Sequence, residues 1–185
     1  MGKRLWKNTI ETEYGQGKFV NYILDVKSFL DAKCLLQKNY GEAYDCTLTS
    51  LASIFGEKHY DLIESVAKKH GYVGKACGTN PFKVKTIMRE VMDSLGIKGK
   101  CYSRYGKGVA FNWHTIGNLL KRGHHVVLNI YQDGRSYYKN HSVLIVGLAR
   151  HGTHKLLAVY DNWNEGISYV DYDKMCMIAS INWYE

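Results

Sequence analysis

Apolar side chains recur every three or four residues through the middle of the chain, which is the spacing of a helix with one buried face. The first segment of this kind begins at Cys46, with Asp45 in the N-cap position and Gly56 as its stop. The same reasoning predicts three further helices, each closed by a glycine, over residues 60–71, 84–96 and 112–123.

After Gly123 the pattern changes to short apolar runs between polar, glycine-containing turns, which is typical of strands. Five strands are predicted, over residues 126–131, 142–148, 156–160, 167–170 and 179–184, with a short turn or helical segment at 171–177. Helices followed by consecutive strands indicate an α+β fold, in which N-terminal helices pack on a C-terminal antiparallel β-sheet.

The chain has the length and composition of one domain: 185 residues, 45% of them hydrophobic, with one proline and no repeat or linker. We expect the domain to cover residues 33–185, preceded by a partly loose arm over residues 1–32. Within that arm a short helix is predicted, lined by Val20, Ile23, Leu24 and Phe29.

The net charge of +8 does not by itself predict a nucleic-acid partner, because the basic residues are scattered among acidic ones and no nucleic-acid-binding motif is present. No apolar run has the length of a signal peptide core or a membrane span. A cytoplasmic protein is therefore expected.

The cysteines and histidines do not form a metal-binding pattern. The five cysteines (Cys34, Cys46, Cys77, Cys101 and Cys176) are odd in number and widely spaced, without a Cys-x-x-Cys pair, so we expect reduced thiols. His124, His125, His151 and His154 lie beside turn glycines and are interpreted as solvated turn residues. No metal and no cofactor is expected.

Cys46 is a candidate nucleophile because the unpaired amides and the dipole of a helix N-terminus stabilise a thiolate. The preceding Asp45 acts against this by repelling a thiolate, so a histidine is required to activate the sulfur. From the local sequence alone, a buried structural cysteine is the alternative.

His141 begins a strongly apolar strand, which places an ionisable ring at a strand end, and Asp161 directly follows the next strand. An antiparallel hairpin with Leu148 opposite His154 would also bring His141 opposite Asp161. In that register the carboxylate of Asp161 is predicted to hold the imidazole.

Four segments in this order resemble the papain-like cysteine peptidases related to the bacteriocin-processing, double-glycine leader peptidases: Gln37, Asp45–Leu51, Asn140–Val143 and Tyr160–Trp163. The resemblance extends over residues 33–185 and implies a papain-like fold. It implies Cys46 as nucleophile, His141 as general base and then acid, Asp161 as the group that orients the imidazole, and Gln37 as the oxyanion donor.

The chain also departs from the leader peptidases. Thr47 follows the nucleophile where they typically have glycine, and Gln37 lies further from Cys46 than their glutamine does. Specificity for a leader peptide is therefore not implied, and Asn39 competes with Gln37 as the amide donor. Trp163 is interpreted as a shield of the contact between His141 and Asp161.

Three functions remain open from the sequence. The first is hydrolysis of a peptide or protein substrate through a thioester at Cys46. The second keeps the same site but deamidates glutamine or transfers the acyl group to an amine. The third is a binding module that keeps the fold without catalysis.

Overall fold

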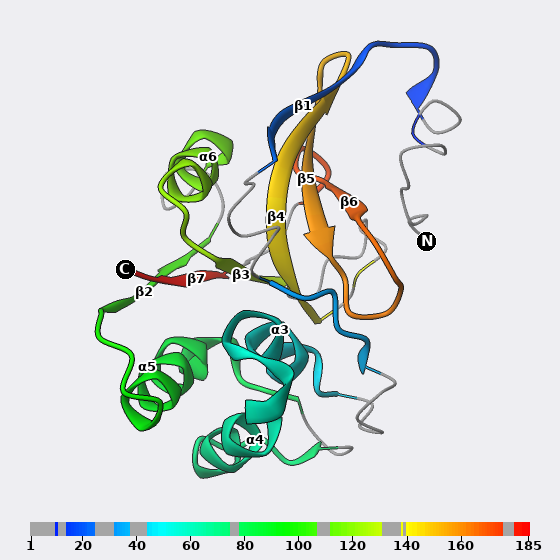
Figure 1. Ribbon diagram of the computed structural model, residues 1–185. Coiled ribbons are helices and arrows are strands. Elements are labelled where there is room, and N and C mark those ends of the chain that lie inside the picture. The colour runs from blue at the N-terminus through cyan, green and yellow to red at the C-terminus, as the bar shows by residue number, and fades with distance from the viewer. Residues whose placement is uncertain are drawn as a thin grey trace.

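The computed structural model describes residues 10, 14–24, 32–37, 44–74, 78–106, 112–130, 138, 140–175 and 180–185, with residues 21–24 described by their backbone. In these residues the chain has an α+β fold in which helices pack on a seven-stranded sheet (Figure 1). The α-helices are α3 (Cys46–Phe55), α4 (Tyr60–Lys69), α5 (Val84–Ser94) and α6 (Trp113–Lys121), with 3-10 turns at Glu57–His59 and Pro81–Lys83.

The strands are β1 (Phe19–Leu24), β2 (Cys101–Tyr105), β3 (Val126–Ile130), β4 (His141–His151), β5 (His154–Tyr160), β6 (Ser168–Asp171) and β7 (Ser180–Tyr184). Six of them are arranged in the order β2-β7-β3-β4-β5-β6, β1 pairs with β4 off this path, and every pair is antiparallel. The long strand β4 pairs with β3 through its first half, with β1 through its second half, and with β5 along most of its other edge.

The four predicted helices are confirmed, and their end signals act as expected at Asn80, Asn112 and Gly56. Asn80 accepts a hydrogen bond from the amide of Phe82, and Asn112 accepts one from the amide of Thr115. Gly56 ends α3 with a φ of 103°, which a residue with a side chain rarely adopts. Among the described residues, no helix has both the length and the apolar composition needed to cross a bilayer.

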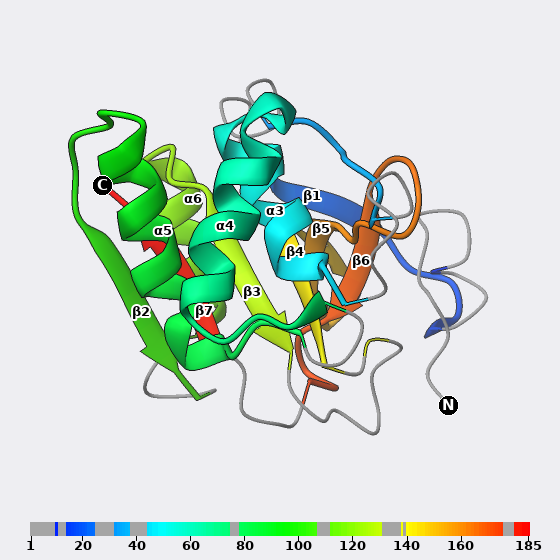
Figure 2. The ribbon, with the colours of Figure 1, turned by 90° about the horizontal axis from the view of Figure 1, so that it is seen from below.

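Helices cover both faces of the sheet. Helices α3, α4 and α5 lie together on one face and α6 on the other, as Figures 1 and 2 show. Val127 and Leu144 pack with the first group, whereas Val126, Leu128 and Ile145 pack with α6. The strands β3 and β4 are therefore continuously buried instead of alternating between core and solvent.

The predicted N-terminal helix is wrong, because residues 19–24 form strand β1 along β4. This segment is rich in aromatic and β-branched residues, which favour a strand, whereas the predicted helix depended on only four apolar positions; of these, Phe29 lies outside the described residues. The short strand β2 was also not predicted.

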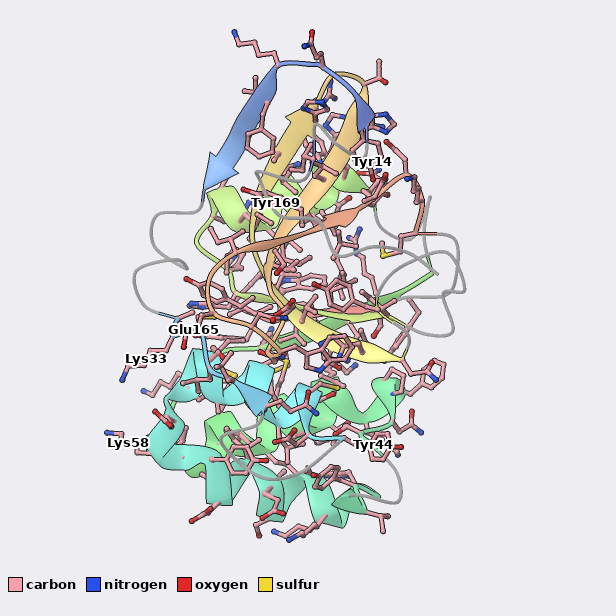
Figure 3. The ribbon with its side chains drawn as sticks, turned by 90° about the vertical axis from the view of Figure 1, so that its right-hand side faces the viewer. Tyr14, Lys33, Tyr44, Lys58, Glu165 and Tyr169 are labelled. Atoms are coloured by element: carbon pink, nitrogen blue, oxygen red, sulfur yellow. The ribbon has the colours of Figure 1, made fainter. Side chains whose placement is uncertain are left out.

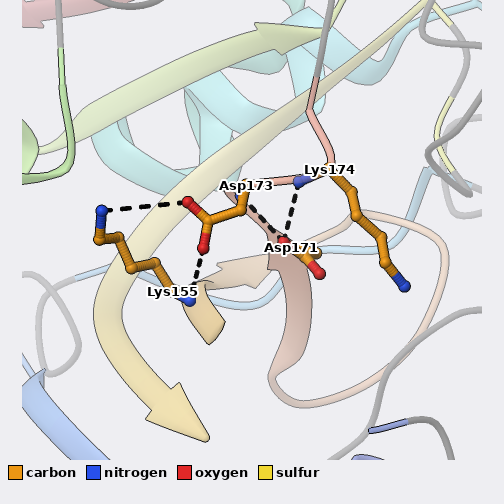
Figure 4. A network of polar contacts seen from close by, with 4 residues as sticks. All are labelled: Lys155, Asp171, Asp173 and Lys174. Carbon is orange, nitrogen blue, oxygen red and sulfur yellow. Dashed lines mark hydrogen bonds and ion pairs between the residues drawn. The ribbon is translucent and has the colours of Figure 1, made fainter. Parts of the chain in front are cut away.

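Polar contacts attach the segment before β1 to the end of the sheet remote from α3. Tyr14 donates to the Asp171 carboxylate and stacks on His154, with ring centroids 4.2 Å apart (Figure 3). Asp171 also caps the turn that follows β6, and Asp173 in that turn accepts a hydrogen bond from the amide of Lys155 on β5 (Figure 4). These contacts connect the N-terminal segment, β5 and β6.

The predicted register of the β4–β5 hairpin is wrong by three residues. His151 pairs with His154 and Leu148 with Leu157, because the turn is made by residues 152 and 153, with Gly152 at a φ of 56°. A bulge between Ile145 and Gly147 shifts the pairing again before the strand reaches the candidate site. His141 and Asp161 are consequently not a cross-strand pair.

Candidate active site

Cys46 is the first residue of α3, as predicted, and its side chain is partly exposed. The backbone amides of the first helical turn lack intrahelical partners, which makes this position favourable for a thiolate and for a developing oxyanion. Tyr44, two residues earlier, is half exposed beside the start of α3 (Figure 3). Cys46 is therefore a partly exposed residue at the start of its helix, although burial still acts on its thiol.

His141 lies against Cys46 although the two residues are 95 positions apart in the sequence. Burial opposes the charged thiolate, but the positive charge of His141 and its hydrogen bond to the sulfur outweigh burial, together with hydrogen bonds from the backbone and hydroxyl of Ser142. The pKa of Cys46 is consequently lowered from its ordinary value. This contact joins the two residues that the sequence selected.

The other side of the His141 ring is held by a backbone carbonyl. Nε2 lies 2.7 Å from the carbonyl oxygen of Asp161, and because a carbonyl only accepts, Nε2 carries the hydrogen. Nδ1 is therefore the ring nitrogen that can pair with Cys46. Tyr138 stacks on the imidazole at 5.4 Å and Trp163 packs on it at 4.0 Å, measured between ring centroids. Two aromatic rings thus fix the plane of the imidazole.

The prediction that the Asp161 carboxylate holds His141 assigned the role to the wrong atom. Oδ1 accepts from the amides of Trp163 and Asn164, and Oδ2 accepts from the hydroxyls of Tyr138 and Ser168. The carboxylate therefore shapes the turn after β5 and orients Tyr138. The main chain of the same residue then presents its carbonyl to the imidazole.

Asn162 joins the cysteine helix to the histidine strand and was given no role from the sequence. Its Nδ2 lies 3.1 Å from the carbonyl of Cys46, 2.7 Å from the Ser50 hydroxyl and 3.0 Å from the carbonyl of Ser142. Its φ of 60° is one that asparagine adopts more readily than most residues. The sequence signal that could have identified this role was the position of Asn162, directly after Asp161 at the end of a predicted strand.

Gln37 is attached to the same turn. Its amide donates to the carbonyl of Asn162 at 2.6 Å, and its Oε1 accepts from the indole nitrogen of Trp163 at 2.8 Å. Because Oε1 accepts from Trp163, Nε2 is the donating end of the side-chain amide, and Gln37 also hydrogen-bonds the carboxyl of Asp45. The competing donor, Asn39, lies outside the described residues.

Asp45 does not act as the predicted side-chain cap of α3. It is fully buried, and its Oδ2 accepts hydrogen bonds from Tyr60, at 2.9 Å, and Thr49. Burial raises the pKa of the Asp45 carboxyl, against the lowering effect of hydrogen bonds from Tyr60, Gln37 and Thr49. The expected repulsion of a thiolate is reduced, because a raised pKa favours the neutral acid.

Two of the four histidines interpreted as solvated turn residues are buried. His151 is 1% exposed, with Nε2 2.8 Å from the carbonyl oxygen of Gly15, and His125 is 8% exposed. The packing of the segment before β1, which the sequence pattern did not reveal, covers His151. Within the described ranges, no three histidine, cysteine or acidic side chains are grouped to hold a metal ion.

Comparison with models of known protein families found no match, and comparison with curated protein sequences found none either.

The role of the Asp161 side chain can be tested with Asp161→Asn. We expect the free energy of unfolding to fall by about 1–3 kcal/mol, because several donors lose a charged acceptor. The rate at which iodoacetamide labels Cys46 should stay close to wild type, because the bond to His141 uses the backbone carbonyl. Asp173→Asn is the matched control. Slower labelling of Cys46 without a loss of stability would indicate that the Asp161 carboxylate orients His141.

Asp45 should make stability depend on pH. Its pKa is raised on folding, so its contribution to stability is complete below the unfolded value of about 3.9 and is lost as the pH rises through the folded value. Asp45→Asn should remove this decline, measured as the free energy of unfolding in urea between those two pH values. Asp61→Asn, at an exposed position on α4, is the control. Parallel curves for Asp45→Asn and wild type would contradict the assignment.

Proposed function

We propose that this chain is a papain-like thiol hydrolase that cleaves a peptide or amide bond through a thioester at Cys46. The observation that carries the proposal is the contact of Cys46, at a helix start, with an imidazole whose other nitrogen donates to the Asp161 carbonyl. Cys46 as nucleophile, His141 as base and the Asp161 carbonyl as orienting acceptor are thus linked by consecutive hydrogen bonds. This is the arrangement that activates a cysteine.

In the acylation step the Cys46 sulfur attacks the substrate carbonyl and forms a carbon–sulfur bond. The negative charge on the former carbonyl oxygen is stabilised by the backbone amide of Cys46 and by Nε2 of Gln37. His141, as imidazolium, then gives the proton on Nδ1 to the departing amine, and the carbon–nitrogen bond breaks.

In the second step water replaces the amine. His141 takes a proton from water, whose oxygen attacks the thioester, and collapse of the intermediate releases the carboxylic acid and the Cys46 thiolate. Trp163 covers one face of the imidazole and is 40% exposed, so it lies between His141 and the solvent. A peptide or protein is the proposed substrate, and the proposal includes no cofactor.

The pairing of Cys46 with His141 predicts two results. Cys46→Ala should abolish hydrolysis of a peptide library while the melting temperature stays near wild type, because the partly exposed side chain contributes little packing. His141→Ala should move the midpoint of the pH profile for Cys46 alkylation up toward the free-cysteine value of about 8.5. Mass spectrometry of the intact protein and its peptides measures the labelling.

Cys101 provides the internal control, because burial raises its pKa and it should be alkylated more slowly than Cys46 at neutral pH. Cys101→Ala should keep hydrolysis. Activity that survives Cys46→Ala would show that Cys46 is not the nucleophile. An unchanged pH profile of Cys46 alkylation in His141→Ala would show that the two residues are not partners. Products joined to an added amine, in place of hydrolysis, would redirect the proposal to acyl transfer.

Gln37 can be tested apart from the nucleophile. Gln37→Ala should lower kcat by about 10²-fold, the typical loss of one oxyanion donor. Iodoacetamide labelling of Cys46 should keep its wild-type pH profile, because alkylation of sulfur forms no oxyanion. Equal losses in both assays would indicate that Gln37 only holds Trp163 and the turn in place.

A further inference from the structure

A row of polar side chains crosses the sheet under α3 and leads to Cys46. It consists of Ser103 on β2, Asn182 on β7, Asn129 on β3 and Ser142 on β4, each opposite or diagonal to the next in the strand register. Asn182, Asn129 and Ser142 are buried within a sheet whose neighbouring positions are apolar. Buried polar groups are costly unless they are hydrogen-bonded, so their orientations are constrained.

The hydrogen bonds of this row all donate in one direction. Ser103 donates to Oδ1 of Asn182, and Nδ2 of Asn182 donates to Oδ1 of Asn129 at 2.8 Å. Nδ2 of Asn129 then donates to the hydroxyl oxygen of Ser142 at 2.6 Å. Ser180 adds a second donor to Oδ1 of Asn129, at 3.1 Å. Each amide therefore accepts on the β2 side and donates on the Cys46 side.

The sulfur fixes which way the last hydrogen points. Ser142 is held beside Cys46, because Nδ2 of Asn162 bonds the carbonyls of both residues, and hydrogen bonds from the backbone and hydroxyl of Ser142 lower the pKa of Cys46. A thiolate can only accept, and the hydroxyl oxygen of Ser142 already accepts from Asn129, so the Ser142 hydrogen is available for the sulfur. The neighbouring Thr47 hydroxyl, 2.7 Å away, can donate to Ser142 in the same arrangement.

We propose that Ser142 is a further catalytic residue, whose hydroxyl donates a hydrogen bond to the Cys46 thiolate and is aimed at it by the amides of Asn129 and Asn182. The inference rests on the proposed function, because it concerns the same nucleophile. The proton stays on Ser142 throughout, so the hydroxyl stabilises charge and takes no part in proton transfer.

Aligned donors polarise one another, which strengthens the last bond beyond that of an isolated serine. A hydrogen bond to a charged acceptor is also stronger than one between neutral groups. The positive ends of the dipoles in the row therefore point toward the sulfur from the sheet. The positive end of the α3 dipole points toward it from the helix.

Other ionisable groups near the sulfur are His141 from β4, Asp45 before α3, and Asp161 and Tyr138 behind the imidazole. His141 acts directly on Cys46, whereas Asp45 is bonded to Tyr60 on α4 and Asp161 to Tyr138. The residues that β3 and β7 contribute to the row are uncharged. A change in Ser142 therefore alters a hydrogen bond to Cys46 and removes no ionisable group.

The test is the pH profile of Cys46 alkylation by iodoacetamide in the full-length protein. Ser142→Ala should raise the midpoint by about one pH unit, the scale of one hydrogen bond to a charged group. Ser142→Thr, which keeps a hydroxyl on a strand, should lie closer to wild type than Ser142→Ala does. Asn129→Ala should raise the midpoint by less than Ser142→Ala, because it removes the support behind Ser142 but not Ser142 itself.

Ser53→Ala is the matched control, because Ser53 is a buried serine on α3 whose hydroxyl donates to the carbonyl of Thr49. It should lower the melting temperature without moving the midpoint. A wild-type midpoint near that of free cysteine would refute the proposed function itself. If the wild-type midpoint is lowered but Ser142→Ala does not change it, only the role of Ser142 is refuted. If Asn129→Ala does not change the lowered midpoint, the oriented row is refuted.

Discussion

The geometry of the site depends on the attachments of Asn162. Its side-chain amide reaches the carbonyls of Cys46 and Ser142, and its own carbonyl receives the amide of Gln37. These three partners come from the start of α3, from β4 and from the segment before α3. A short turn of backbone held at a positive φ therefore sets the distances between Cys46, strand β4 and Gln37.

Cys46 and His141 were recognisable in the sequence because each lies at the end of a strongly patterned element. Apolar periodicity locates such ends well, because the apolar run begins or stops there. The α+β fold followed from the same patterns. The segment 19–24 was misread because a few apolar residues fit helical spacing as well as strand alternation, and only pairing with β4 decides between them.

The atom that holds His141 lay beyond sequence reasoning for a different reason. Asp161 was selected for its carboxylate, but the register that placed it opposite His141 ignored a bulge and the exact position of the turn. A shift of this kind changes which group of a residue faces its neighbour, and a backbone carbonyl carries no signature in the sequence. The polar row from Ser103 to Ser142 was missed similarly, because its members lie on four strands that only the sheet order brings together.

The arrangement of strands around β4 also determines when the site can exist during folding. The helix that carries Cys46 forms from local contacts, but its partners are supplied by β4 and by the turn after β5, more than 90 residues later in the chain. Contacts of such long sequence separation form late and slowly. A partly synthesised or partly folded chain therefore contains Cys46 without the imidazole that lowers its pKa, so the lowered pKa arises only once the sheet is assembled.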